Sequence, residues 1–453
     1  MPRKRGTPKP ELANKLKSGW EILQARLDEV ESYNREYLRF LSAVKTEREA
    51  AEYFKGLAGE AAGLYLVENR GKAVAVCRKG RAPLKEGIRI VVAHIDCPRL
   101  DLKANPLYED TELAMLKTHY YGGIKKYQWL ARPLAVHGVL VKEDGRLVKV
   151  VIGEEENDPC LTIEDLLPHL AANAQYSKKL SEAFQAEKLN IILGSRPDLS
   201  VKESRVKEYI LKLLHDKYGI VEQDFVSADL EIVPAGPARE VGIDRSLVGG
   251  YGQDDRVCSW AAFAAVRDAV KPGFTSIALL MDKEEIGSEG NTGAKSMFIE
   301  EVLWELGERF KEEIVPQRVL YRSKAISGDA NGALDPDYPE VHEKLNAARI
   351  GYGVCVTKFT GSRGKVGSSE AHAEYMAYIR ALLNRNGIPW QTGELGKVDE
   401  GGGGTVAKFL AEYGMDIVDM GPPLLSMHSP FELSSKVDTY STYLAYRAFM
   451  EEK

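Results

Sequence analysis

The stretch from Ile88 to Ala93 leaves this chain few ways to fold. Nearly all of its residues are apolar and most are β-branched, which is typical of a strand buried on both faces of a sheet. A similar apolar run lies between Thr275 and Met281, and a helical pattern precedes it from Val257 to Val270. Buried strands that alternate with helices in this way predict an α/β fold.

Further elements are predicted on both sides of these runs. From Pro10 to about Gly59 the pattern is helical, with Leu16, Trp20, Leu23 and Leu27 spaced to share one helix face. The remaining predicted strands cover residues 64–68, 73–77, 319–326 and 416–419, and the remaining predicted helices of this part cover residues 369–386 and 436–450.

The pattern changes between about residues 98 and 239. The runs Val139 to Lys142 and Leu147 to Ile152 flank a turn at Asp144 and Gly145, and a polar helix is expected from Glu203 to Lys217. The alternation of buried strands and helices resumes near residue 241. We therefore expect an α/β domain of residues 1–97 and 240–453, interrupted by a smaller, partly β domain of residues 98–239.

Charge and cysteine usage exclude several classes of protein. The 61 basic and 67 acidic side chains give a net charge of −6, so the chain lacks the positive charge of a dedicated nucleic-acid binder. No apolar run approaches the ~18 residues of a membrane span, so we expect no membrane partner. The basic first 17 residues lack the apolar region of a secretory signal, and the five cysteines form no C-x-x-C pair. These features predict a cytoplasmic protein.

Titratable side chains come directly after the predicted strands, at the edge where an open α/β sheet binds its ligands. They are His94 and Asp96 after the strand 88–93, Glu284 and Glu285 after 275–281, Asp329 after 319–326, and His428 in the loop after 416–419, joined by Asp254 before a predicted helix. A single residue of this kind is more often a solvated or structural group. Because so many carboxylates and imidazoles would be costly to bury together without cations, the set predicts a site for two divalent metal ions.

The local spacing of these residues suggests separate roles. Side chains two apart on an extended chain point the same way, so Asp96 can hold the ring of His94. Glu284 and Glu285 are adjacent and point to opposite sides, so one can bind a metal while the other reaches the water that the metals activate. Asp254 has two carboxylate oxygens and can bridge two ions.

Five blocks of sequence resemble, in order, the motifs of the M18 family of metallo-aminopeptidases. The blocks are residues 93–98 (AHIDCP), 254–259 (DDRVCS), 282–288 (DKEEIGS), 327–329 (SGD) and 427–429 (MHS). Residues 121–123 (YGG), with Trp129 and Arg132 after them, and residues 387–391 (GIPWQ) are also similar to that family. The resemblance spans nearly the whole chain.

The resemblance implies a three-layer metallopeptidase domain with a mixed central sheet, and an aminopeptidase that cleaves the N-terminal bond of peptides with a free N-terminus. It implies metal ligands at His94, Asp254, Glu285, Asp329 and His428, with Glu284 as the general base and Asp96 as the carboxylate that holds His94. Zinc is the expected metal, and cobalt or manganese would accept the same ligands. In this family the inserted domain mediates dimer contacts and dimers form a tetrahedral dodecamer, so a homo-oligomer is implied here.

Two departures from the aspartyl aminopeptidase branch leave the preferred N-terminal residue open. Asp329 is followed by Ala330, Asn331 and Gly332 without the histidine of that branch, and Asn173 stands where the branch has a histidine in the insertion. Three alternative functions are a metallo-carboxypeptidase or deacylase with the same ions, a nucleotide-binding protein that uses the glycines 401–404, and an inactive assembly protein.

Overall fold

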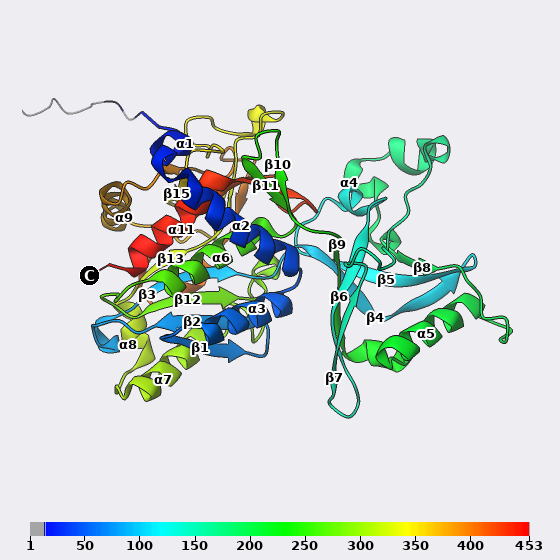
Figure 1. Cartoon of the computed structure of the whole chain (residues 1–453). Coiled ribbons are helices and arrows are strands. Elements are labelled where there is room, and N and C mark those ends of the chain that lie inside the picture. Colours follow the sequence, from blue (N-terminus) through cyan, green and yellow to red (C-terminus); the bar gives the residue numbers. More distant parts are fainter. Residues whose placement is uncertain (1–12, 14, 453) are drawn as a thin grey trace, which may run out of the picture.

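The structure is a computed structural model that describes residue 13 and residues 15–452. Its chain forms two lobes (Figure 1). The larger one, the main lobe, contains an eight-stranded sheet with helices on both faces, and the smaller one, the second lobe, contains a six-stranded sheet. The α/β class predicted from the sequence is therefore confirmed.

The main sheet is mixed. Its strands, in spatial order, are β1 (Leu64–Asn69), β2 (Ala73–Arg78), β12 (Ser276–Met281), β3 (Arg89–His94), β13 (Lys324–Ser327), β19 (Asp416–Gly421), β15 (Val354–Thr357) and β17 (Trp390–Thr392). The central strands β12, β3, β13 and β19 run parallel, whereas β2 and β15 pair antiparallel to their neighbours β12 and β19. The carboxyl ends of the four central strands consequently lie at one edge, where open sheets of this kind bind ligands.

Helices cover both faces of the main sheet. One face packs against α2 (Leu27–Ala43), α3 (Glu47–Glu60), α6 (Gln253–Asp268), α9 (Ala373–Arg385) and α11 (Lys436–Met450), and the other against α7 (Phe298–Phe310), α8 (Pro316–Tyr321) and α10 (Ala407–Ala411). Val91 and Ala93 of β3 lie in the first core, and Ile90 and Val92 lie in the second. This alternation explains why the strand reads as an almost unbroken apolar run.

The second lobe is built on a sheet whose strands all lie between Arg99 and Pro234. In spatial order they are β7 (Leu147–Ile152), β6 (Leu134–Val141), β9 (Ala228–Pro234), β4 (Arg99–Asp110), β5 (Leu113–Tyr121) and β8 (Ile191–Gly194). Helix α5 (Arg205–Tyr218) packs against it, and α4 (Leu180–Ala183) lies in the segment between β7 and β8. The lobe has a separate apolar core that contains Leu100, Leu140 and Ile232.

Charged side chains are buried where the two lobes meet. Glu47 of α3 lies 3.4 Å from Arg99 of β4, and Arg99 lies 3.1 Å from Glu231 of β9. All three side chains are buried. We call these three residues the interlobe charge cluster; because burial of a charge is costly unless it is paired, the cluster fixes one lobe against the other.

Small sheets complete the fold. The five-stranded one contains, in order, β10 (Arg239–Val241), β11 (Leu247–Gly250), β21 (Glu432–Ser435), β20 (Pro423–Leu425) and β14 (Asn331–Gly332), and the two-stranded one pairs β16 (Gly361–Ser362) with β18 (Gly402–Gly403). Gly250 of β11 pairs with Glu432 of β21, which brings the chain near Asp254 next to the chain near His428.

The predicted elements agree with the structure in most places and differ in two. The strand expected over residues 319–326 is wrong in its first half, because residues 316–321 form helix α8 with Pro316 in its first turn and only residues 324–327 form a strand. The single helix face expected near the N-terminus is also wrong: α1 (Gly19–Ile22) is short, and Leu16 and Leu27 are exposed. Residues 10–12 and 14 of that prediction lie outside the described residues.

Among the residues that the structure describes, no helix is long and apolar enough to cross a membrane.

Candidate active site

Most of the predicted site residues lie at the carboxyl edge of the parallel strands. His94 ends β3, Glu284 and Glu285 follow β12, and Asp329 follows β13. Gly328, which precedes Asp329, packs so tightly that an added Cβ atom would lie 2.7 Å from the Tyr446 hydroxyl. The backbone before Asp329 is thus fixed by packing.

Two further residues reach this edge from the five-stranded sheet. Asp254 lies in the first turn of α6, after β11, and its backbone is not helical. His428 lies in the loop between β20 and β21 with φ of 64°. The buried Glu432 joins both segments, because it accepts hydrogen bonds from the backbone N–H groups of Asp254 (3.1 Å) and His428 (2.7 Å).

The carboxylate of Asp254 lies between the two histidines. Its Oδ1 atom is 3.4 Å from Nε2 of His94, and its Oδ2 atom is 3.3 Å from Nε2 of His428. The two oxygens of one carboxylate therefore face two different imidazoles. This arrangement suits a carboxylate that bridges two cations, each of which also has a histidine ligand.

The candidate ligand atoms of the site form groups that are compact enough to surround one metal ion. The atoms of His94, Asp254 and Asp329 lie within 4.8 Å of one another, and so do those of Asp254, Glu285 and His428. Each of these two groups contains one imidazole and two carboxylates, and Asp254 belongs to both. His94, Glu284 and Glu285 form a third group within the same distance.

Hydrogen bonds orient both histidine rings. The Nδ1–H group of His94 donates to the backbone carbonyl of Asp96 at 2.9 Å, and that of His428 donates to the carbonyl of Gly123 at 2.9 Å. Because a carbonyl oxygen only accepts, the hydrogen is on Nδ1 in each ring. When either ring is neutral, its Nε2 atom has a lone pair that faces the carboxylates, which is the orientation that a metal ligand needs.

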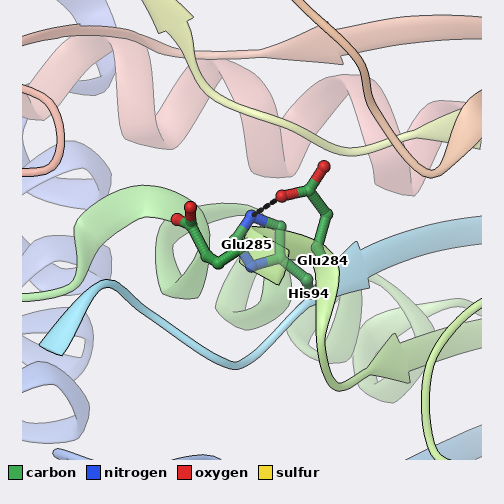
Figure 2. A group of neighbouring side chains, drawn as sticks. All are labelled: His94, Glu284 and Glu285. Carbon is green, nitrogen blue, oxygen red and sulfur yellow. Dashed lines mark ion pairs between the residues drawn. The ribbon is translucent and has the colours of Figure 1, made fainter. Parts of the chain in front are cut away.

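Glu284 and Glu285 lie on either side of the His94 ring, as Figure 2 shows. The expectation that they lie on an extended chain is wrong, because they lie on a 3-10 turn (Glu284–Ile286). Glu284 Oε2 is 3.9 Å from His94 Nε2. Asp96 positions this turn, since its Oδ1 and Oδ2 atoms accept the backbone N–H groups of Glu284 (3.1 Å) and Glu285 (3.2 Å). Its carboxylate also lies 3.4 Å from His94 Nδ1.

The electrostatics of the site show an excess of buried negative charge. Burial raises the pKa of Glu285 and of Asp329 well above the usual range of a carboxyl group. Burial, together with the nearby carboxylates, raises the pKa of Glu284 to about 7. Burial alone would lower the pKa of His428, but the hydrogen bond with Asp254 and the charge of Glu285 raise it to about 10. These four shifts indicate that the site favours additional positive charge.

The residues fit a pair of bound cations. Asp254 Oδ1 and Glu285 Oε1 are buried and have no hydrogen-bond partner among the described residues, although both face histidine nitrogens. A buried carboxylate oxygen without a partner is costly, and a divalent cation would satisfy it. Imidazole and carboxylate ligands together are suited to zinc, cobalt and manganese.

A cavity of about 450 Å³ opens beside these ligands. Its lining includes the carboxylates of Glu284 and Asp329 and also the apolar side chains of Phe359, Leu395 and Phe409. The volume is sufficient for a small ligand. A ligand in this cavity would lie with one end against the proposed metal ligands and another against apolar side chains.

Glycines 401–404 line the cavity and contribute to β18, and the helix after them, α10, has only five residues, which gives no support to a phosphate site. Asn173 is exposed in the second lobe.

Sequence reasoning missed two residues that hold the site together. Glu432 joins the Asp254 and His428 segments, and Tyr121 donates a hydrogen bond to Asp96. Tyr121 had been noted only as part of a motif. An acidic residue is usually solvated, so the position of Glu432 four residues after His428 does not indicate a role in the site.

Comparisons with known proteins indicate one family. A family model described as "Aminopeptidase I zinc metalloprotease (M18)" matches residues 41–450. The "Probable M18 family aminopeptidase 1" of Thermotoga maritima is 48% identical over 442 residues, which cover 94% of this chain and 97% of that protein. The crystal structure of an M18-family aminopeptidase from T. maritima has a TM-score of 0.93 at 46% identity and covers 97% of this chain and 100% of that one. A dodecamer of S. cerevisiae mApe1, only 20% identical, shares the fold with a TM-score of 0.74, and the match covers 93% of this chain and 97% of that one.

Proposed function

This chain belongs to the M18 family of zinc metallo-aminopeptidases, and from that membership we propose that it binds two divalent cations and uses Glu284 as its general base. The substrates of an aminopeptidase are peptides with a free N-terminus. The metallo-aminopeptidase activity follows from the family, whereas the number of ions and the role of each residue are parts of the proposal.

The observation that carries the proposal is the position of Asp254 between the two histidines, with one oxygen 3.4 Å from His94 Nε2 and the other 3.3 Å from His428 Nε2. We assign His94, Asp254 and Asp329 to one cation, and Asp254, Glu285 and His428 to the other. This assignment leaves Glu284 outside both ligand sets. Zinc is the metal of the family, and the same ligands would accept cobalt or manganese.

Glu284 is the group that moves the proton. When bound, the two cations polarise the scissile carbonyl and lower the pKa of the attacking water. Glu284 accepts a proton from that water as it attacks and returns the proton to the departing amine nitrogen, so that the peptide bond breaks without a covalent intermediate. Asp96 holds the backbone of Glu284 and thereby keeps its carboxylate beside the attacked carbonyl. The carboxylates of the cavity are the acceptors that we assign to the substrate's free α-amino group.

The assembly and location of the protein are further parts of the proposal. We assign residues 98–239 as the domain that mediates dimer contacts, in a tetrahedral dodecamer of the cytoplasm. Support comes from large apolar side chains that are exposed in the second lobe, with Leu167, Leu170, Tyr176 and Leu180 between 49% and 70% exposed. A group of exposed apolar side chains is typical of an interface. Analytical ultracentrifugation of the full chain tests this, because a monomer at micromolar concentration contradicts it.

The experiment that tests the function compares free and blocked peptides after controlled metal supply. The protein is stripped with a chelator, supplied with zinc, cobalt or manganese one at a time, and assayed with aminoacyl reporter substrates and with their N-acetylated counterparts. We expect activity only with metal and only on the free amines. Activity on the N-acetylated series indicates a deacylase instead, and activity that survives chelation contradicts the metal mechanism.

The number of cations is measured separately. Elemental analysis of the active protein should give two ions per chain, and Asp254→Asn should reduce both, because Asp254 belongs to both ligand sets. A single ion per chain at full activity contradicts the bridging role of Asp254.

A further inference from the structure

Strand β5 of the second lobe ends at the active site. Its last residue, Tyr121, pairs in the sheet with Arg99, the first residue of β4, which follows the site residues His94 and Asp96 by a few positions. Gly122 and Gly123 continue from Tyr121 toward the site. One short segment of the second lobe, residues 121–123, thus lies against catalytic groups that belong to the main lobe.

The hydroxyl group of Tyr121 holds Asp96. It donates a hydrogen bond of 2.8 Å to Asp96 Oδ2, and both side chains are buried. Asp96 in turn accepts the backbone N–H groups of Glu284 and Glu285. The Tyr121 hydroxyl is therefore connected through one carboxylate to the proposed general base and to a proposed metal ligand.

The ring of Tyr121 is held from its other side. The guanidinium group of Arg99 lies 3.9 Å from the ring centroid, which is the distance of a cation–π contact. Arg99 is itself fixed by the carboxylates of the interlobe charge cluster. The position of the Tyr121 hydroxyl thus depends on the contact between the two lobes.

The two glycines approach the metal ligands closely. A Cβ atom on Gly122 would lie 3.3 Å from Cβ and Oε2 of Glu285, and its φ of 71° is a conformation that disfavours other residues. A Cβ atom on Gly123 would lie 3.3 Å from Nδ1 of His428. The carbonyl of Gly123 accepts the Nδ1–H of the same ring at 2.9 Å. A side chain at either position would push against a metal ligand.

We infer that residues 121–123 are a positioning element of the active site, in which Tyr121 fixes Asp96 and the carbonyl of Gly123 fixes the ring of His428. The inference rests on the proposed function and extends it, because it gives the second lobe a part in the geometry of the metal ligands in addition to any part in assembly. Groups of this kind orient metal ligands, and their removal typically costs 10- to 100-fold in metal affinity or activity.

The test removes one hydroxyl group. Tyr121→Phe keeps the ring under Arg99 and loses only the hydrogen bond to Asp96, and Tyr120→Phe, the same change at the exposed neighbour, is the matched control. We measure the dissociation constants of zinc by competition with a chromophoric chelator, and kcat and KM separately. We expect zinc affinity and kcat to fall about 10- to 100-fold in Tyr121→Phe with little change in KM, and Tyr120→Phe to behave as the wild type.

A second variant tests the same element without Tyr121. Gly123→Ala keeps the carbonyl but places a methyl group against the His428 ring, and Gly56→Ala, where a Cβ atom meets nothing within 4 Å, is its control. Circular dichroism establishes that each variant is folded. We expect weaker zinc binding in Gly123→Ala alone, and this variant decides the matter if Tyr121→Phe does not fold.

The outcomes separate this inference from the proposed function. If Tyr121→Phe is folded and has the zinc affinity and kcat of the wild type, the positioning role is overturned and the aminopeptidase proposal stays intact. If Tyr121→Phe does not fold, wild-type zinc affinity in Gly123→Ala has the same meaning. Absence of zinc binding or of peptidase activity in the wild-type protein overturns the proposed function itself.

Discussion

Replacing Glu284 with glutamine tests the mechanism most directly. The two side chains have the same shape, so Glu284→Gln keeps the packing of the 3-10 turn and the backbone hydrogen bond to Asp96. What it removes is the ability to accept a proton. General-base catalysis contributes about 10²- to 10⁴-fold, so we expect kcat to fall by that factor, which corresponds to a barrier higher by about 3 to 5 kcal/mol.

The metal content of Glu284→Gln distinguishes the role of Glu284 from that of Glu285. Both proposed ligand sets exclude Glu284, so Glu284→Gln should retain two ions, whereas Glu285→Gln should lose affinity for the cation that it shares with His428 and Asp254. Glu289→Gln, a change at an exposed glutamate nearby, is the matched control.

Steady-state assays on an aminoacyl reporter and elemental analysis of the same protein samples give the two readouts. Glu284→Gln with more than a tenth of the wild-type kcat refutes its role as the base. Loss of an ion from this variant shows that Glu284 is a ligand instead, and the reasoning from the two ligand sets is then wrong.

Three further predictions concern stability. Arg99→Met removes the cation beside the buried Glu231, while Glu47 keeps its ion pair with Lys72 at 3.0 Å, and we expect a loss of about 3 to 5 kcal/mol in the free energy of unfolding by urea; a loss below about 1 kcal/mol contradicts the importance of the cluster. Burial opposes the charged form of His137, but hydrogen bonds with Glu154 and Glu49 raise its pKa above the ordinary value. The charged form of His137 therefore contributes its full stability below about pH 6.5, and this contribution is lost as the pH rises through the raised pKa. We expect the urea midpoint of the wild type to fall as the pH rises through this range, and the midpoint of His137→Gln to fall less. Chelation should lower the unfolding temperature, since a cation at 100 times its Kd adds about 2.7 kcal/mol per site, and zinc should restore it; an unchanged temperature argues against the metal site.

The sequence predicted strands most clearly where both faces of the strand are buried. The strand at residues 88–93 has apolar side chains on both faces, and the structure places it at β3. The run 319–326 was ambiguous because a short apolar segment can be one face of a helix or a strand, and Pro316 at the start of α8 favoured the helix. Local patterns thus predict which segments are buried more reliably than how they are folded.

The candidate site was predictable in part for the same reason. His94 is the last residue of β3, and Glu284 and Asp329 lie within three residues of the ends of β12 and β13, so their convergence follows from the parallel arrangement of these strands. The placement of Asp254 between two histidines depends instead on the pairing of β11 with β21, which no local pattern determines. The hydrogen bond from His428 to the carbonyl of Gly123, 305 residues away, has no sequence signal at all.

The separation of the ligands along the chain has a consequence for biosynthesis. His94 is translated before the second lobe, Asp254, Glu285 and Asp329 are translated after it, and His428 is the last of the proposed ligands to be made. Because the chain is made from its N-terminus, a growing polypeptide has no complete pair of ligand sets until that histidine has emerged. Polypeptides that end before residue 428 would therefore lack one proposed metal ligand, and we expect them to have no peptidase activity.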